Sequence, residues 1–282
     1  MDADITVRPV ETQEEFRACH AVQRAAWSFP DLMIVPYTQL VTLQLQGGLV
    51  LGAYDGHDLV GFVYGFLGRR VRGPIHLFSQ RLAVVPAYRG RGIGAKLKWA
   101  QRTWALEQEL TRIVWTYDPL QAVNANLNVT KLGGVVRHYR RDVFGSQIAE
   151  TGSDLATDRF LLEWDLLAER VFARLSPDWL PPSGRELQAG AEAPVNTVTW
   201  DEQGLPICGQ PDIERDGGSL LVEVPADWPR ILKADAGLAR DWRTKTRHLF
   251  EGYLARGYVV TGYAADRGAN RRSCFYLMEN AE

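Results

Sequence analysis

The first 165 residues alternate between short apolar runs and segments with the 3.6-residue spacing of a helix. Residues 5–10 form the first apolar run and predict a strand. Thr12 and Glu15 have the spacing of a capping box, in which each side chain bonds the other residue's backbone N–H. A helix is expected to follow, with these apolar residues on one face: Phe16, Cys19, Val22 and Ala26.

Three further apolar runs, at residues 49–54, 59–67 and 75–85, predict three strands. Asp55-Gly56 separates the first two runs, and this dipeptide favours the tight turns that join antiparallel strands. We therefore expect these runs to form an antiparallel meander.

The next part of the chain returns to helical spacing. The apolar residues of the predicted helix are Ile93, Leu97, Ala100 and Trp104. A strand at 112–117, a short polar helix at 124–134 and strands at 134–139 and 160–164 are expected after it. The predicted order is β-α-β-β-β-α-β-α-β-β, which is an α/β (α+β) pattern.

Prolines interrupt this pattern beyond Ser176. Residues 176–194 are proline-rich and lack periodicity, which predicts a linker. A second, smaller α+β unit is expected beyond it, with a helix at 238–256 and strands at 195–200, 220–225, 258–263 and 274–279. We thus expect a domain over residues 1–170, a linker over 171–195 and a smaller domain over 196–282.

The N-terminal and C-terminal parts of the chain share a weak internal sequence similarity. Leu82, Val85, Pro86 and Ala87 recur as Leu221, Val224, Pro225 and Ala226, and Val135, Val136, Tyr139 and Asp142 recur as Val259, Val260, Tyr263 and Asp266. Unrelated strands of similar composition explain this similarity as well as a duplication does. Under a duplication, the C-terminal domain is a degenerate half that has lost the ligand site.

Composition and charge narrow the class of protein. The apolar fraction is 46 %, the charged fraction 23 % and the net charge −2, so nothing favours nucleic acid or an anionic membrane surface as a partner. The cysteines Cys19, Cys208 and Cys274 are far apart and odd in number, which favours a reducing compartment. With no signal-peptide pattern and no apolar stretch of bilayer length, we expect a cytoplasmic protein without a metal site.

The stretch LAVVPAYRGRGIGAK, residues 82–96, places a glycine-rich turn before a predicted helix. A P-loop requires GxxxxGK[ST], and no Gly-Lys pair occurs. The spacing Gly90-x-Gly92-x-x-Ala95 fits a dinucleotide fingerprint loosely, with Asp118 as the ribose acid, but a meander precedes it where a Rossmann unit begins afresh. A helix entry that binds no ligand is the structural alternative.

Arg89-x-x-Gly92-x-Gly94 resembles the R/Q-x-x-G-x-G/A pyrophosphate loop of the GNAT N-acyltransferase superfamily. The resemblance covers residues 1 to about 165 and extends to the predicted strand order. Glycines let backbone amides converge without a Cβ in the way, and the helix N-terminus favours an anion. The loop residues expected to bind coenzyme A (CoA) are Arg89, Gly90, Arg91, Gly92, Ile93, Gly94 and Ala95.

The resemblance implies a mixed, mostly antiparallel sheet whose central parallel strands, 75–85 and 112–117, splay apart around the pantetheine arm of acyl-CoA. Backbone groups of Leu82, Ala83 and Val84 are expected to pair with the pantetheine amides, and one N–H there to polarise the thioester carbonyl. Asn124 and Asn128, one helical turn apart, are expected to bond the same arm; a solvated polar face is the alternative.

Direct attack by an amine requires a group that removes a proton. Asp118 ends the strand 112–117 and is the first candidate, with a turn-forming aspartate before Pro119 as an equal alternative. His76 is a second candidate, although a strand histidine of structural role is the commoner case.

Many members of the superfamily carry a tyrosine that protonates the leaving thiolate, and Val129 stands at that position here. Tyr117 or Tyr139, or solvent, is expected to substitute.

The run WTYDPLQAVNANLNVTKLGG is similar to a branch of the superfamily that is thought to acylate amino acids. The sequence thus predicts an N-acyltransferase that uses acetyl-CoA or succinyl-CoA as co-substrate, without a permanently bound cofactor, and a small-molecule amine as acceptor. A catalytically silent CoA-binding or regulatory module is the alternative, and a homodimer is left open. The loop after the first helix, with Trp27, Phe29, Pro36 and Tyr37, is expected to line the acceptor pocket, although buried aromatics are more often core.

Overall fold

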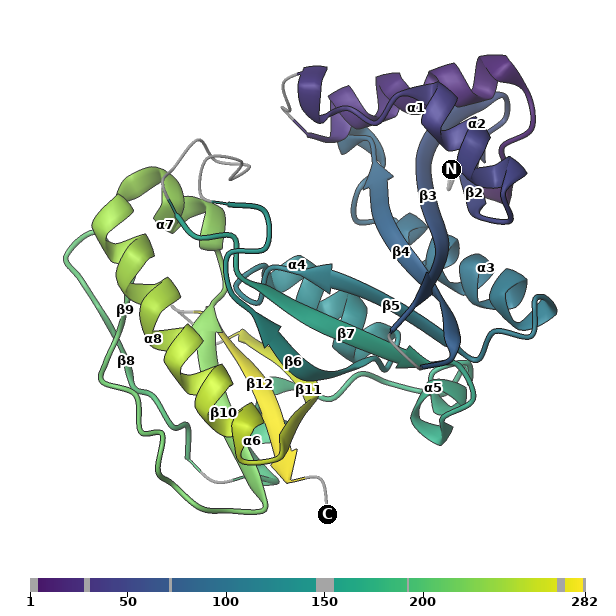
Figure 1. Ribbon diagram of the computed structural model, residues 1–282. Coiled ribbons are helices and arrows are strands. Elements are labelled where there is room, and N and C mark those ends of the chain that lie inside the picture. The colour runs from purple at the N-terminus through teal and green to yellow at the C-terminus, as the bar shows by residue number, and fades with distance from the viewer. Residues whose placement is uncertain are drawn as a thin grey trace. The chain divides into compact units, whose positions relative to one another are not determined.

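A computed structural model describes residues 5–27, 31–70, 73–145, 155–191, 193–267 and 272–280 (Figure 1). The chain divides into two compact units. Unit 1 comprises residues 1–115 and 165–168, and unit 2 comprises residues 116–164 and 169–282. Phe29, expected in the acceptor pocket, lies outside the described residues.

Unit 1 is built on a sheet in the order β1-β2-β3-β4-β5. Its elements are β1 (Ile5–Pro9), α1 (Gln13–Ala26), α2 (Tyr37–Leu45), β2 (Leu49–Asp55), β3 (Asp58–Arg69), β4 (Ile75–Val84), α3 (Ile93–Glu107) and β5 (Arg112–Tyr117), whose last two residues belong to unit 2. Strands β2, β3 and β4 pair antiparallel, so the predicted meander is confirmed. Gly56 makes the tight turn between β2 and β3 with φ +59°, in the left-handed region that glycine enters without strain.

Both faces of this sheet are covered by helices. The capping box of α1 is confirmed, since the Thr12 side chain accepts from the Glu15 N–H and the Glu15 carboxylate accepts from the Thr12 N–H. Alternate residues of β3 serve the two cores. Phe62 packs with α1 and α2, and Val63 packs with Ile93 and Leu97 of α3.

Helix α2 corrects the sequence analysis, which treated the segment after α1 as a loop. Tyr37 begins α2 and Pro36 precedes it, without a side-chain cap. Trp27 and Tyr37 pack against the core between α1 and the sheet rather than standing free in a loop. Only Leu40 of α2 is fully buried, so the sequence has no apolar stripe from which this helix could be predicted.

Unit 2 contains a five-stranded run in the order β7-β6-β11-β12-β10. Its elements are α4 (Ala122–Ala125), a π-helical turn (Asn126–Lys131), β6 (Val135–Arg140), β7 (Arg159–Asp165), α5 (Glu169–Ala173), α6 (Gly184–Ala189), β8 (Val198–Trp200), β9 (Pro206–Cys208), β10 (Ser219–Pro225), α7 (Trp228–Ala234), α8 (Ala236–Ala255), β11 (Tyr258–Arg267) and β12 (Arg272–Asn280). The strands and the long helix predicted beyond residue 195 are therefore present. The proline-rich segment also carries α6, which begins with a capping box between Ser183 and Glu186.

The hairpins β6–β7 and β11–β12 have the same internal register. Val136 pairs with Leu162, and Val260 pairs with Met278; β11 follows β6 by 260 − 136 = 124 residues, and β12 follows β7 by 278 − 162 = 116 residues. Each hairpin has one bulge at the corresponding place, directly after Val136 in β6 and directly after Val260 in β11. The two valines also pair with each other where β6 meets β11 antiparallel. Equivalent residues that meet in an antiparallel pair are related by a local two-fold axis.

Candidate functional site

The glycine-rich turn leaves open space where a phosphate group could approach. Gly90 and Gly92 have φ of +80° and +77°, and a Cβ on either would meet no atom within 4 Å. Both residues are exposed. Gly92 is the N-cap of α3, and its carbonyl accepts the first helical bond, from the Lys96 N–H at 3.0 Å. The N–H groups of Ile93, Gly94 and Ala95 belong to the first helical turn, where no preceding carbonyl can receive them.

The two arginines of the turn have different contacts. The Arg89 guanidinium donates to the carbonyl oxygens of Val84 at 3.2 Å and Ala26 at 2.5 Å, so it ties the turn to the ends of β4 and α1. The Arg91 guanidinium lies 4.9 Å from the ring centroid of Tyr88. Arg89 and Arg91 are both exposed, so each places a cation at the surface beside the glycines.

Beside this turn, one edge of strand β4 lacks a strand partner among the described residues. Its parallel ladder with β5 consists of Leu77 with Ile113 and Phe78 with Val114. Among the described residues, the segment Leu82, Ala83 and Val84 pairs only with β3, on the opposite edge. The register with β3 shifts so that Gln80 is a bulged residue, and bulges commonly occur beside active sites.

Lys98 is a buried cation that the sequence analysis did not single out. It is 3 % exposed, and its Nζ lies 2.7 Å from Ser79 Oγ, 3.2 Å from Gln101 Oε1 and 3.6 Å from the centroid of the Trp115 ring. Burial lowers the pKa of the Lys98 amine well below its ordinary value. No sequence pattern indicated its burial, because Lys98 lies outside the predicted apolar stripe of α3.

His76 lies at the start of β4, away from the glycine turn in the sequence. It is 9 % exposed, and its Nδ1 is 3.4 Å from the carbonyl oxygen of Pro74. Its ring lies against Gly68 of β3, since a Cβ there would come within 2.9 Å of His76 Nε2. These contacts are those of a histidine packed in a hairpin, and the proposed proton-accepting role of His76 stays a prediction.

Asp118, in unit 2, forms a buried ion pair with Arg243 of α8. Arg243 donates from Nη1 to Oδ1 at 2.8 Å and from Nη2 to Oδ2 at 2.6 Å, and the Leu120 N–H donates to Oδ1 at 2.9 Å. The side chains of Arg243 and Asp118 are 3 % and 12 % exposed. Although burial opposes the charge, Asp118 raises the pKa of Arg243 above its ordinary value. The predicted role of Asp118 as a base requires one of these bonds to open.

Tyr117 and Tyr139, the expected substitutes for the missing tyrosine, both lie in an aromatic cluster of unit 2. Phe160 contacts both rings edge to face, at centroid distances of 5.7 Å and 5.8 Å. Tyr276 donates to Tyr117 Oη at 3.4 Å, and Tyr139 donates to Asp158 Oδ2 at 2.6 Å. Burial raises the pKa of both phenols, so each is a weaker acid than a free tyrosine.

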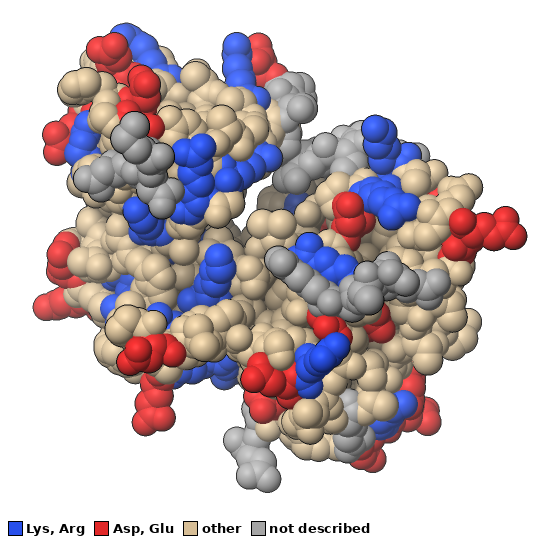
Figure 2. Space-filling model, turned by 180° about the vertical axis from the view of Figure 1, so that it is seen from behind, with Lys and Arg blue, Asp and Glu red and all other residues tan. Residues whose placement is uncertain are grey.

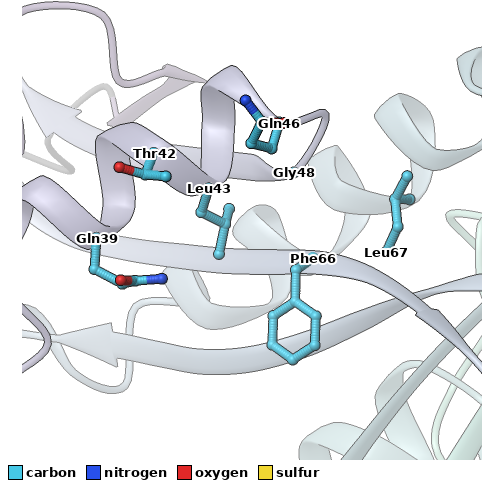
Figure 3. A pocket seen from close by; sticks show the side chains of 7 residues that line it. All are labelled: Gln39, Thr42, Leu43, Gln46, Gly48, Phe66 and Leu67. Atoms are coloured by element: carbon cyan, nitrogen blue, oxygen red, sulfur yellow. The ribbon is translucent and has the colours of Figure 1, made fainter.

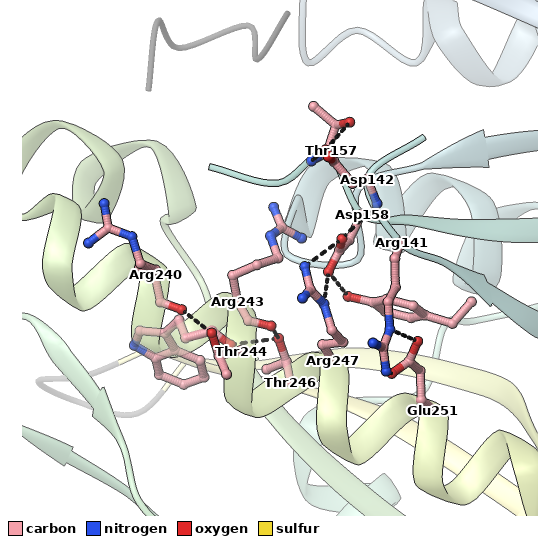
Figure 4. A network of polar contacts seen from close by, with 12 residues as sticks. Arg141, Asp142, Thr157, Asp158, Arg240, Arg243, Thr244, Thr246, Arg247 and Glu251 are labelled. Carbon is pink, nitrogen blue, oxygen red and sulfur yellow. Dashed lines mark hydrogen bonds and ion pairs between the residues drawn. The ribbon is translucent and has the colours of Figure 1, made fainter. Parts of the chain in front are cut away.

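A second ion pair anchors α8 near this cluster (Figure 4). Arg247 donates from Nε to Asp158 Oδ2 at 2.7 Å and from Nη2 to Oδ1 at 2.9 Å. Burial raises the pKa of Asp158, but the hydrogen bonds from Arg247 and Tyr139 outweigh it and hold that pKa below its usual value. The exposed pair Arg141–Glu251 lies one turn further along α8.

Asn124 and Asn128 differ in environment. Asn124 is exposed on α4, whereas Asn128 is 4 % exposed in the π-helical turn. The wider turn is seen in the bond from the Leu132 N–H to the Leu127 carbonyl, and π-turns occur frequently at functional sites. Val129, at the position where the family often has tyrosine, is fully buried. A shared role of the two asparagines on one CoA arm stays a prediction.

The described residues lack two other kinds of site. They contain no group of His, Cys, Asp and Glu that could hold a metal ion, and no helix long and apolar enough to cross a membrane. Basic and acidic side chains are interspersed on the face in Figure 2. A shallow surface pocket between α2 and β3 is lined by Gln39, Thr42, Leu43, Gln46, Gly48, Phe66 and Leu67 (Figure 3), none of which is a predicted site residue.

Comparison with solved structures finds similar chains of low identity. The ribosomal-protein-S18-alanine N-acetyltransferase from Escherichia coli is 15 % identical, with a TM-score of 0.46 over 57 % of this chain and 94 % of that one. An N-acetyltransferase from Staphylococcus aureus Mu50 is 16 % identical, with a TM-score of 0.46 over 58 % and 99 %. The acetyltransferase yncA from Salmonella typhimurium, solved with acetyl-CoA, is 18 % identical, with a TM-score of 0.46 over 63 % and 98 %. No curated protein matches the sequence significantly.

The sequence was also compared with models of protein families, and one of them matches. Residues 12–132 match the model of the acetyltransferase (GNAT) family. This range runs from the capping box of α1 to the end of the π-helical turn and includes the glycine-rich turn. Residues 12–132, which make up less than half of the chain, are therefore similar to the GNAT family of acetyltransferases.

Proposed function

We propose that this protein transfers an acyl group from acyl-CoA to the amine of a small molecule such as an amino acid. The observation that carries the proposal is the turn at Gly90 and Gly92, where left-handed glycines with open space precede the N-terminus of α3. A diphosphate needs converging N–H donors and no Cβ in its path, and this turn offers both. Arg91 and Arg89 add positive charge beside it.

The unpaired edge of β4 is the proposed place for the pantetheine arm. The amide groups of that arm resemble a peptide, so they can pair with Leu82, Ala83 and Val84 as a strand would. A backbone N–H of this segment then donates to the thioester carbonyl oxygen and stabilises the charge that develops there. The bulge at Gln80 bends β4 at the start of this edge.

The proposed reaction is a direct displacement. The neutral amine attacks the thioester carbon, a C–N bond forms and the C–S bond breaks. One proton leaves the amine nitrogen for a base or water, and the CoA thiolate takes up one proton. Either acetyl-CoA or succinyl-CoA is compatible with this chemistry, and the three buried free cysteines favour the reducing cytoplasm as its location.

A catalytically silent CoA-binding module is the second candidate. It is favoured by Val129, a buried apolar residue where a proton-donating tyrosine is frequent in the family. The two candidates share the CoA site and differ only in turnover. Release of free thiol from acetyl-CoA and succinyl-CoA, with and without a panel of amino acids, separates them.

For the C-terminal segment we propose a degenerate copy of the N-terminal architecture, without a CoA site of its own. The equal register and the equal bulge of β6–β7 and β11–β12 support a duplication. In the copy, β10 is followed by α7 with Pro229 in its first turn, and no left-handed glycine stands there. A proline lacks the N–H that an anion site needs. Light scattering of the purified chain would decide whether it is a homodimer.

The CoA site is tested with Gly92→Asp, which adds a side chain and a negative charge where the diphosphate is expected. Gly145→Asp is the matched control, because Gly145 has the same φ of +77° and equally open surroundings in unit 2. Both substitutions carry the same backbone strain, of about 1 kcal/mol. We expect CoA binding, measured by titration calorimetry, to be lost in Gly92→Asp and kept in Gly145→Asp. Equal affinity in the two folded variants would refute the site.

A further inference from the structure

Lys98 lies where the two central strands of unit 1 cease to pair. The last ladder pair is Phe78 with Val114, and the next residues along each strand are Ser79 and Trp115. Lys98 Nζ contacts both, at 2.7 Å from the Ser79 hydroxyl oxygen and 3.6 Å from the Trp115 ring centroid. An amine from α3 thus occupies the vertex of the fork between β4 and β5.

Packing does not explain this lysine. Its contacts are a hydroxyl, the Gln101 carbonyl oxygen and an aromatic ring, and among the described residues it forms no ion pair with a carboxylate. Desolvation is the cause of its lowered pKa. Replacing a buried charged group by an apolar one of similar volume is often neutral or stabilising, so a buried lysine without a counter-ion is costly for stability alone. Groups of this kind cluster at functional sites.

The charged groups on the neighbouring strands are directed elsewhere. His76 on β4 and Arg112 on β5 are each three residues from the Lys98 contacts and so lie on the opposite face of the sheet. Arg81 donates to the Gln23 side chain of α1 and to the Met33 carbonyl. Arg102, on the same helix as Lys98, donates to the Leu166 carbonyl.

We propose that Ser79 and Lys98 together supply the proton that the departing CoA thiolate requires. This inference rests on the proposed function, which places the thioester along β4. As the C–S bond breaks, the Ser79 hydroxyl gives its proton to sulfur, and Lys98 gives one of its ammonium protons to Ser79 Oγ. Lys98 is then neutral and regains a proton from water, which has received the proton lost by the acceptor amine. Ser79 is the residue that contacts the reacting atoms, and Lys98 acts through it.

An ammonium group with a lowered pKa suits this task. A thiol has a pKa near 8.5, and proton transfer is most effective when the donor's pKa is close to that of the acceptor and to the working pH. An ordinary lysine, at about 10.4, is a poorer donor. The pair also provides what Val129 cannot, since a valine side chain has no proton to give.

Lys98→Met tests the proposal, with Arg102→Met as the matched control. Both are buried cations of α3, but Arg102 holds the Leu166 carbonyl at 2.8 Å and has a structural role. For Lys98→Met we expect kcat to fall about 10²-fold or more, an unchanged KM for acetyl-CoA and a melting temperature that is equal or higher. For Arg102→Met we expect a lower melting temperature and a kcat close to that of the unaltered protein.

Two readouts distinguish proton supply from packing. In the unaltered protein kcat should decline at high pH as Lys98 loses its proton, and this decline should vanish in Lys98→Arg, which stays charged. With 4-nitrothiophenyl acetate as donor, whose thiolate needs no proton, the loss in kcat/KM for Lys98→Met and Ser79→Ala should shrink to less than about tenfold.

An unchanged kcat in Lys98→Met overturns the inference, whatever its melting temperature, and so does a loss that is equally large with the aryl thioester. Absence of acyl transfer in the unaltered protein, with CoA binding intact, would instead refute the proposed function.

Discussion

The buried pair Asp118–Arg243 should be a large contributor to the stability of unit 2. Two parallel N–H···O bonds of 2.8 and 2.6 Å join the side chains, and the Arg243 guanidinium carbon also lies 5.2 Å from the Trp228 ring centroid. Removing one partner of such a pair leaves the other charge buried and typically costs about 3–5 kcal/mol. At roughly 2–4 °C per kcal/mol for a unit of this size, Asp118→Asn or Arg243→Met should lower the melting temperature by roughly 6–20 °C.

The double variant provides the sharper measurement. With both charges removed, neither is left unpaired, so Asp118→Asn/Arg243→Met should be more stable than the sum of the single losses predicts, by about 2–3 kcal/mol. Urea unfolding of the four proteins gives this coupling energy. The exposed pair Arg141–Glu251 is the control, because Glu251→Gln should cost only about 0–1 kcal/mol. If the stability losses of the two single variants sum to that of the double variant within about 0.5 kcal/mol, the two side chains are not coupled.

The same variants decide what Asp118 does in catalysis. If it is the base, Asp118→Asn should reduce kcat by about 10²–10⁴-fold. Arg243→Met, which keeps the carboxylate, should then retain most of the rate. If Asp118 only fixes the end of β5 to α8, both single variants should lose similar rates, measured well below their melting temperatures.

Two further predictions concern stoichiometry and acid stability. Calorimetry should find one CoA per chain, because the turn after β10 carries Pro229 and no left-handed glycine; two CoA per chain would contradict the degenerate copy. The pKa of Glu15 is lowered from 4.5 to about 2, mainly by the hydrogen bond from Arg8. The ionised Glu15 carboxylate therefore contributes fully to the free energy of unfolding above pH 4.5, and this contribution is lost as the pH falls towards 2. In acid unfolding, Glu15→Gln should flatten this part of the stability profile, and a profile unchanged by the substitution would refute the assignment.

Local signals made most of unit 1 predictable. The capping box of Thr12 and Glu15 and the turn at Gly56 act within a few residues, so their chemistry is legible in the sequence. Helix α2 was missed for the opposite reason: Pro36 offers no side-chain cap, and burial of Leu40 depends on strands that follow later in the chain.

The chemistry of the candidate site was only partly legible. The glycine-rich turn was predictable from its sequence pattern. The ion-pair partner of Asp118 was not, because Arg243 lies 125 residues further along the chain. No spacing rule connects residues so far apart, and only the folded arrangement identifies Arg243. Lys98 was missed for the same reason, since it lies outside the predicted apolar stripe of α3 and its contacts with Ser79 and Trp115 exist only in the folded chain.

The pairing of β6 with β11 determines where the chain can be cut. The family match ends at residue 132, just before β6, and the β6–β7 hairpin meets β11 through Val136 and Val260. A chain ending after β7 would expose the β6 edge, with free N–H and C=O groups that can recruit strands from other molecules. It would also leave the Asp118 carboxylate without the Arg243 guanidinium. The segment after β7 thus covers the β6 edge, and an expression fragment that ends after β7 should be recovered as insoluble material.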